Sequence, residues 1–353
     1  MTRRELLWLS GSGLIGAAGL RGAEPENLSY PLRSVDGTVT QPSRFFVRDH
    51  FAAPSIALES WRLRIEGRVE RPYELTFSDL VESPATKIEA VLECAGNVAG
   101  GSAVSNGVWE GVPLGQLLAR AKPAADAALV MLEGADTGKI FTDKPSLPYS
   151  QLVSLKECTE PQSMVAFKLN DLALPGRNGF PMRALFPGSY GMNSVKWLQR
   201  IVVLGPNEQN ENVYKSGVLR LYNRVSRTDG SDKVVRLSSV QIKSAIAWPD
   251  NGTKLPAGRH TVWGFAWGGT GRVRRVAVST DGGKVWRDAE FQSPNSSFAW
   301  VKWSYRWDAG PGEYAIMSRA SDESGNEQPL RRDPARKDGY ELNWCAPLHC
   351  SVG

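Results

Sequence analysis

Apolar and polar residues alternate along several short segments of the chain, which is the period expected of β-strands with one buried face. Residues 87–94 give the clearest example, and a turn of small residues follows at 95–97. The alternation places a thiol at the end of the buried face, which consists of Ile88, Ala90, Leu92 and Cys94. Such a thiol is either a small buried hydrophobe or a group that holds a ligand, and the strand alone does not decide between the two.

Similar patterns predict a mixture of strands and short helices up to about residue 235. A helix is expected to begin at Phe77 with Ser78 as its N-cap, a second at Val112, and a third over 147–155 after a proline. Strands are expected at 61–69, 128–132, 164–169 and 201–204. Elements in this order predict an α+β domain over 24–235.

The pattern changes after about residue 240, where short strands follow one another without a helical period. Asp281-Gly282-Gly283 stands between two apolar stretches and predicts a hairpin turn. A further strand has one face formed by Val301, Trp303, Tyr305 and Trp307. The sequence therefore predicts an all-β sandwich over 236–353.

The first 23 residues are predicted to be an export signal that is not part of the fold. Arg3 and Arg4 precede an apolar run over 6–20, which is too short to span a membrane comfortably. A paired arginine before such a run is typical of twin-arginine signals, so we expect a periplasmic protein. No other segment of the sequence is expected to cross a membrane.

Charge and cysteine content narrow the classes of function. The 353 residues carry a formal net charge of +5, and the basic residues are scattered, so no nucleic-acid-binding surface is expected. The four cysteines form neither a haem-attachment motif nor the spacings of zinc and iron–sulfur sites. Cys345 and Cys350 are close in sequence and are predicted to form a disulfide in an exported protein.

Five segments resemble, in order and spacing, motifs of the sulfite oxidase family of molybdenum enzymes. They are 46–50 (FVRDH), 93–97 (ECAGN), 134–136 (GAD), 178–183 (NGFPMR) and 194–197 (SVKW). None is specific alone, but as a set they extend the resemblance over nearly all of the chain after the export signal. By this resemblance the sandwich is expected to be immunoglobulin-like and to support a homodimer.

The resemblance also implies roles for individual residues. Cys94 would be the thiolate ligand to molybdenum, and Arg48 would attract a small oxyanion. Tyr214 and Tyr222 are both candidates for the active-site tyrosine of the family. Binding of the molybdopterin cofactor is expected from Phe46, Val47, Arg48, Asp49, His50, Cys94, Asp136, Asn178, Arg183, Ser194, Val195 and Lys196.

The chain departs from the family pattern near the expected site. Asp49 and Asn178 replace an asparagine and a histidine. Val98-Ala99 follow the cysteine motif where sulfite-oxidising relatives have arginines, and Asn193 replaces a further arginine. These departures leave the cofactor prediction unchanged but bring the choice of sulfite as substrate into question.

The resemblance implies a molybdopterin-dependent oxidoreductase that transfers an oxygen atom to sulfite or another small sulfur compound. Electrons would pass to a separate carrier such as a periplasmic c-type cytochrome, since no haem is expected in this chain. Two alternatives remain open. One is the reverse chemistry, reduction of an S-oxide or N-oxide, and the other is a non-catalytic subunit of a sulfur-oxidising complex.

Overall fold

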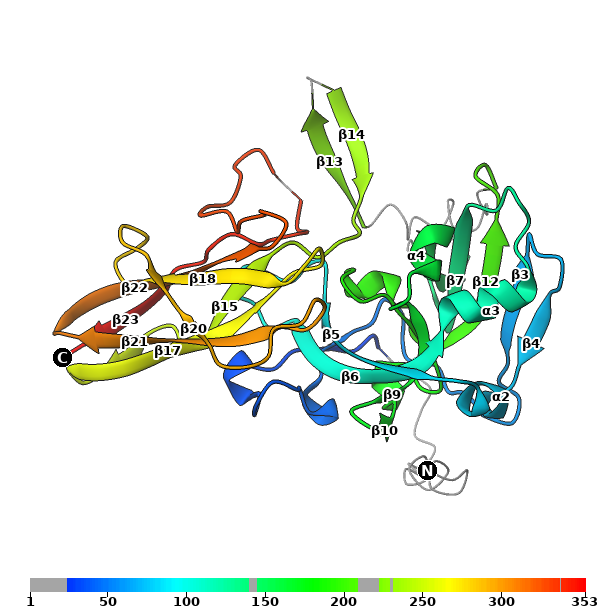
Figure 1. Ribbon diagram of the computed structural model, residues 1–353, viewed down its shortest axis with the longest axis horizontal. Coiled ribbons are helices and arrows are strands. Elements are labelled where there is room, and N and C mark those ends of the chain that lie inside the picture. The colour runs from blue at the N-terminus through cyan, green and yellow to red at the C-terminus, as the bar shows by residue number, and fades with distance from the viewer. Residues whose placement is uncertain (1–23, 140–144, 209–221, 229–230, 337) are drawn as a thin grey trace.

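The computed structural model describes residues 24–139, 145–208, 222–228, 231–336 and 338–353. Two β-rich bodies lie along the long axis of the molecule, the first on the right of Figure 1 and the second on the left. α-Helices are few and short in the described residues, and none of them is long and apolar enough to cross a membrane. The predicted β content is confirmed. The helices are too few and too short to establish the predicted α+β class for the first body.

The first sheet of the N-terminal body leads to Cys94. Its strands lie in the order β10–β9–β6–β5, with β11 also paired to β9. All of these pairings are antiparallel, and the predicted strand before Cys94 is confirmed as β5. The strands are β5 Thr86–Glu93, β6 Val104–Pro113, β9 Met164–Leu169, β10 Leu172–Ala173 and β11 Arg183–Leu185.

The second sheet of this body has the order β4–β3–β12–β7–β8. Strand β12 runs parallel to β3 and antiparallel to β7. The strands are β3 Leu63–Gly67, β4 Tyr73–Leu75, β7 Leu129–Gly138, β8 Leu147–Ser154 and β12 Leu198–Leu204.

The helix predicted over 147–155 is wrong, because this segment forms strand β8. Its backbone pairs antiparallel with β7, and Val153 is completely buried, so sheet pairing overrides the local pattern. Helix α4, Leu155–Thr159, begins only afterwards, and Ser154 caps it by accepting a hydrogen bond from the Glu157 amide at 3.1 Å.

The other two helices cover the apolar core of the N-terminal body. Helix α2, Phe77–Glu82, is capped by Thr76 and not by Ser78, since the Thr76 Oγ1 accepts a hydrogen bond from the Asp79 amide at 3.2 Å. Helix α3, Leu114–Ala121, buries one apolar face against the core. That face consists of Leu114, Leu117, Leu118 and Ala121, and it packs in one cluster with Leu63, Ile65, Val130 and Ile201.

The C-terminal body is the predicted β-sandwich. One sheet has the order β15–β17–β21–β20 and the other β16–β23–β22–β18–β19. The predicted hairpin turn is confirmed between β18 and β19, with positive φ at Gly282 and Gly283. The strands are β15 Lys243–Trp248, β16 Thr253–Leu255, β17 Gly258–Trp267, β18 Val273–Ser279, β19 Arg287–Asp288, β20 Glu290–Phe291, β21 Val301–Ala309, β22 Gly312–Asp322 and β23 Leu348–Val352.

Short elements connect these sheets. Strand β1, Asn27–Leu28, pairs with β2, Val47–Arg48. Strands β13, Asn223–Thr228, and β14, Ser231–Arg236, form a hairpin that projects at the top of Figure 1. Single 3₁₀ turns are η1 Leu32–Ser34, η2 Pro42–Arg44, η3 Gly176–Asn178 and η4 Gly191–Asn193.

The sandwich packs against the strand that leads to Cys94. An apolar cluster crosses the boundary and includes Val91 and Ala95 of the first body with Phe265 and Trp300 of the second. The rings of Phe265 and Trp300 stack with centroids 4.2 Å apart. The Val91 amide also donates to the carbonyl oxygen of Phe298 at 2.8 Å, so the backbone of β5 is hydrogen-bonded to the second body.

All four cysteines carry free thiols, so the predicted disulfide is wrong. Cys350 lies in β23 and packs into the core of the sandwich. Cys345 is buried in the preceding loop. Each of the two thiols is buried at its own place in the second body. Nearness in sequence therefore does not lead to a bond between them.

Candidate active site

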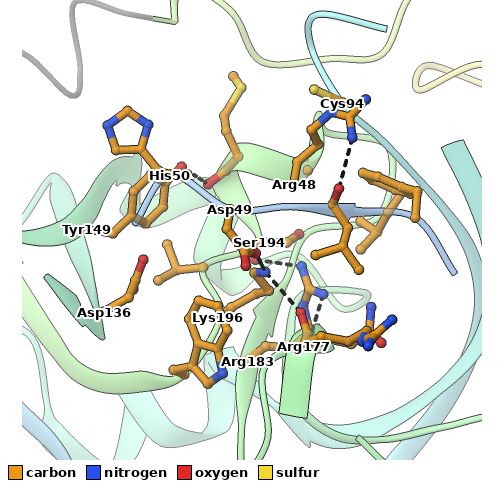
Figure 2. Close-up of a pocket in the computed structure, with 18 of the residues that line it drawn as sticks. Arg48, Asp49, His50, Cys94, Asp136, Tyr149, Arg177, Arg183, Ser194 and Lys196 are labelled. Atoms are coloured by element: carbon orange, nitrogen blue, oxygen red, sulfur yellow. Dashed lines mark hydrogen bonds and ion pairs between the residues drawn. The ribbon is translucent and has the colours of Figure 1, made fainter. Parts of the chain in front are cut away.

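A cavity of about 270 Å³ lies in the N-terminal body, where Cys94 comes close to strand β2 and to the turns around η3 and η4. Every predicted site residue that the structure describes lines this cavity, and Tyr214 lies outside the described residues. Figure 2 shows Arg48 beside Cys94, with Asp49, Arg183 and Lys196 gathered below them. The predicted residues that line it are Phe46, Val47, Arg48, Asp49, His50, Cys94, Asp136, Asn178, Arg183, Ser194, Val195, Lys196 and Tyr222.

Cys94 is held at the cavity by the backbone of the turn that follows β5. Its amide donates to the carbonyl oxygen of Ala103 at 3.0 Å, and its carbonyl oxygen accepts from the Asn97 amide at 2.9 Å. Burial raises the pKa of the thiol, against the lowering effects of a backbone hydrogen bond and of Arg48 and Lys243. A cation at the thiol would favour its ionised form.

Glu93, the residue before Cys94, is a completely buried carboxylate held from several sides. Lys243 of the sandwich forms an ion pair with Glu93 Oε1, and both side chains are at most 1% exposed. Trp267 Nε1 donates to Glu93 Oε2 at 2.8 Å, and Asn97 Nδ2 donates to Oε1 at 2.9 Å. A buried carboxylate needs such partners, so these bonds fix the end of β5 relative to the second body.

Arg48 stands beside Cys94 with an exposed side chain. Its Nη1 donates to the carbonyl oxygens of Val47 at 3.0 Å and Leu28 at 3.4 Å. These contacts use only part of the donor capacity of a guanidinium, which has five N–H bonds. The remaining N–H groups have no partner among the described residues, so they can bind an anion that approaches the thiol.

Arg183 ties together the loops at the other end of the cavity. Its Nη2 donates to the carbonyl oxygen of Ser194 at 2.7 Å and its Nη1 to that of Asn178 at 3.0 Å. Its Nε donates more weakly to the carbonyl oxygen of Ala184 at 3.4 Å, which leaves two N–H bonds unused. Burial lowers the pKa of Arg183 to about 9, so the side chain is still a cation at neutral pH.

Lys196 forms an ion pair with Asp49, whose side chain is only 1% exposed. The Lys196 ammonium also donates to the carbonyl oxygen of Arg177 at 3.0 Å and lies 4.2 Å from the centre of the Trp197 ring. Burial lowers the pKa of Lys196, whereas Asp49 raises it. The carboxylate at position 49 therefore neutralises part of the positive charge that an asparagine would leave free.

Two buried oxygens in this region lack a hydrogen-bond partner among the described residues. They are Asp136 Oδ1 and Asn178 Oδ1, and both residues line the cavity. Burial raises the pKa of Asp136 to about 7, although Lys196 lowers it. Because buried polar atoms are nearly always paired, these oxygens indicate a bound group that offers N–H donors.

Tyr149 is the main lining residue that the sequence analysis missed, because its segment was predicted to be a helix. Strand β8 brings its ring to 5.7 Å from that of His50, and its hydroxyl donates to the carbonyl oxygen of Met192 at 3.1 Å. Burial raises the pKa of Tyr149 and of Tyr222, so both phenols stay protonated at neutral pH. Burial lowers the pKa of His50, which favours its neutral imidazole.

Two family models match the chain in consecutive regions. Residues 50–212 match the oxidoreductase molybdopterin binding domain, and residues 235–336 match the Mo-co oxidoreductase dimerisation domain. The first region contains Cys94, Asp136, Arg183 and Lys196, so the family model covers most of the cavity.

Individual relatives agree with these models. The chain is 30% identical to the sulfite oxidase of Gallus gallus over 338 residues, covering 87% of this chain and 72% of the relative. It is 31% identical to the mitochondrial sulfite oxidase of Mus musculus, but the match covers 83% of this chain and only 58% of that protein. The crystal structure of the sulfane dehydrogenase SoxCD from Paracoccus pantotrophus superposes with a TM-score of 0.80 at 27% identity, covering 97% of this chain and 94% of that one. The chain therefore belongs to the sulfite oxidase family of molybdopterin oxidoreductases.

Proposed function

We propose that the protein binds a molybdenum–molybdopterin cofactor in this cavity and oxidises a small sulfur compound. One observation carries the proposal: the Cys94 thiol, Arg48 and a group of buried polar residues line the same cavity. A non-catalytic subunit has no need of a thiol, an unpaired arginine and unpartnered oxygens in the same place.

The residues present fit this cofactor. A thiolate such as that of Cys94 is a soft ligand of the kind that molybdenum accepts. The unused N–H bonds of Arg183 and Lys196 would bind the cofactor phosphate, while Asp136 Oδ1 and Asn178 Oδ1 would accept hydrogen bonds from the pterin. When bound, the cofactor supplies two-electron oxygen-atom transfer.

The chain's own residues would orient the substrate for this chemistry. Arg48 would hold a negative charge next to Cys94, and the protonated phenol of Tyr222 would donate a hydrogen bond to a substrate oxygen. For sulfite, water supplies the oxygen of the product: sulfite and water give sulfate, two protons and two electrons. The electrons would leave singly to a separate carrier, for which we propose a periplasmic c-type cytochrome.

The same proposal includes location and assembly. The paired arginines at 3 and 4 support export by the twin-arginine route to the periplasm. The match to a dimerisation domain supports a homodimer formed through an immunoglobulin-like second body. Replacing both arginines by lysine should retain the protein in the cytoplasm, and light scattering of the purified protein should give twice the chain mass.

A substrate panel on cofactor-loaded protein tests the function. Purified protein should contain about one molybdenum per chain, as expected for a single thiolate ligand, and should reduce cytochrome c or a redox dye when a sulfur compound is added. Metal-loaded protein that oxidises no sulfur compound would contradict the proposal. If a reduced dye were instead consumed on addition of an S-oxide, the reaction would run in the opposite direction.

A further inference from the structure

A turn of the second body is bound directly onto the Cys94 turn. This covering turn consists of residues 338–341, and its Glu341 amide donates to the carbonyl oxygen of Ala95 at 3.0 Å. The carbonyl oxygen of Gly339 lies 3.7 Å from the position that a Cβ on Gly96 would occupy. The covering turn is therefore in contact with both residues that follow the thiol.

Arg336 holds the covering turn in one shape. Its Nη2 donates to Asp338 Oδ1 at 2.7 Å and to the carbonyl oxygen of Tyr340 at 2.8 Å. The Tyr340 amide donates to the same carboxylate oxygen at 3.1 Å. These bonds preorganise the backbone of the covering turn without a ligand.

The Tyr340 ring lies next to a ring of the cavity wall. Its centre lies 5.9 Å from that of Tyr222, at an interplanar angle of 48°, and Tyr222 lines the cavity with Cys94. Both rings pack against the cluster that contains Ala95 and Met192. Burial raises the pKa of Tyr340, so its hydroxyl stays neutral.

Two described cations near these rings, Arg336 and Arg236, are already engaged. Arg336 is bound to Asp338, and Arg236 Nη2 donates to Asn193 Oδ1 at 3.0 Å. Positions 98 and 99 carry an exposed valine and an alanine. Among the described residues, the substrate side of Cys94 thus combines two neighbouring neutral aromatic rings with the cation of Arg48.

We propose that Tyr340 is a specificity-determining residue, which together with Tyr222 selects a substrate whose reacting sulfur is divalent and uncharged, as in a thioether. Divalent sulfur makes favourable contacts with aromatic rings, whereas a desolvated oxyanion needs several donors or cations. Oxidation of a thioether forms one S–O bond with oxygen from water, and releases two protons and two electrons to the one-electron carrier. This inference rests on the proposed function, because it names the substrate class of the same site.

The test compares binding of tetrahydrothiophene and sulfite by calorimetry to molybdenum-loaded enzyme reduced with titanium(III) citrate, so that no turnover occurs. Tyr340→Ala should weaken the binding of tetrahydrothiophene by about 2- to 10-fold and leave that of sulfite within about 2-fold. Tyr340→Phe keeps the ring and should bind tetrahydrothiophene as the wild type does. Tyr305→Ala, which removes a ring from β21 of the same body, is the matched control and should change neither constant.

Three results would overturn the inference: equal effects of Tyr340→Ala on both compounds, equal effects of Tyr340→Phe and Tyr340→Ala, or tighter binding of sulfite than of tetrahydrothiophene by the wild type. Binding needs no turnover, so it decides the role of Tyr340 independently of catalysis. A wild type that binds tetrahydrothiophene but oxidises no sulfur compound would overturn only the proposed function.

Discussion

The two ends of the cavity use polar groups in opposite ways. The cofactor end, formed by Asp49, Asp136, Asn178, Arg183 and Lys196, consists mostly of buried side chains. It combines a buried ion pair with oxygens that lack a partner among the described residues. At the thiol end, the described residues are Cys94, the exposed cation of Arg48 and the neutral ring of Tyr222, with the Tyr340 ring next to it. Groups that hold a resident cofactor can be buried permanently, whereas groups that meet a substrate must stay accessible and must release the product.

The largest effect is expected at Cys94 of the thiol end. Cys94→Ser should lose both molybdenum and activity, because a hydroxyl is not a soft ligand. Outer-shell substitutions around metals typically cost 10- to 100-fold, so loss of the ligand should exceed about 100-fold. Metal analysis and a dye assay measure the two losses, and Cys158→Ala, at a buried thiol outside the cavity, is the control. A Cys94→Ser protein with normal metal content and activity would refute the ligand assignment.

The buried character of the cofactor end predicts a large stability effect. Lys196→Met should destabilise cofactor-free protein by about 3–5 kcal/mol, because it leaves the buried Asp49 carboxylate without its cation. Urea unfolding measures the change, and the double variant Asp49→Asn/Lys196→Met should recover most of the loss. Arg259→Ala, which breaks an exposed pair with Asp308, should cost less than about 1 kcal/mol. Similar losses for both single variants would show that the cofactor end is not buried in solution.

Asp136 gives the cofactor end a distinctive pH dependence. Burial raises its pKa from 3.8 to about 7, so the folded protein binds this proton more tightly than the unfolded chain does. The folding stability of the wild type should therefore fall as pH rises from about 4 to about 7, by at most about 4 kcal/mol at 1.36 kcal/mol per pH unit. Asp136→Asn has no such carboxyl group and should not show this fall.

Unfolding of cofactor-free protein across this pH range measures the effect. Asp281→Asn is the control with the opposite sign, because hydrogen bonds from the Val285 amide and from Ser279 lower the pKa of Asp281. The stability contributed by Asp281 is present at neutral pH and is lost as pH falls through its lowered pKa. Parallel pH profiles for wild type and Asp136→Asn would mean that Asp136 is solvated in the free protein.

At the thiol end, Arg48 should affect only anionic substrates. Arg48→Gln should raise KM for sulfite by about 10- to 150-fold, since a charge-assisted hydrogen bond contributes about 1.5–3 kcal/mol. Molybdenum content and KM for a thioether should stay unchanged. A change of similar size for both substrates would assign Arg48 to the cofactor instead.

Much of the cofactor end could be predicted from sequence because its residues occur in short contiguous motifs. Asp49, Arg183 and Lys196 each lie in such a segment, and the structure brings these segments to one cavity. Strand β5 was equally clear, since its alternation reflects one buried face.

What the sequence did not predict depends on contacts between distant segments. Tyr149 reaches the cavity only because β8 pairs with β7, a tertiary contact that no local pattern within 147–155 encodes. Tyr340 lies in the other body, and its turn meets the Cys94 turn through a backbone hydrogen bond from Glu341 to Ala95, which carries no sequence signature. Arg183 was assigned to the cofactor alone, but most of its bonds hold neighbouring loops together.

The buried pair between Glu93 and Lys243 has a consequence for the order of assembly. Lys243 lies in the first strand of the sandwich, so the carboxylate next to Cys94 gains its cation only after that strand has been synthesised and has docked. A ribosome-bound chain that ends before β15 would contain every cofactor-binding motif, but the end of β5 would lack its anchor. We therefore expect cofactor insertion to be a late step that follows synthesis of both bodies.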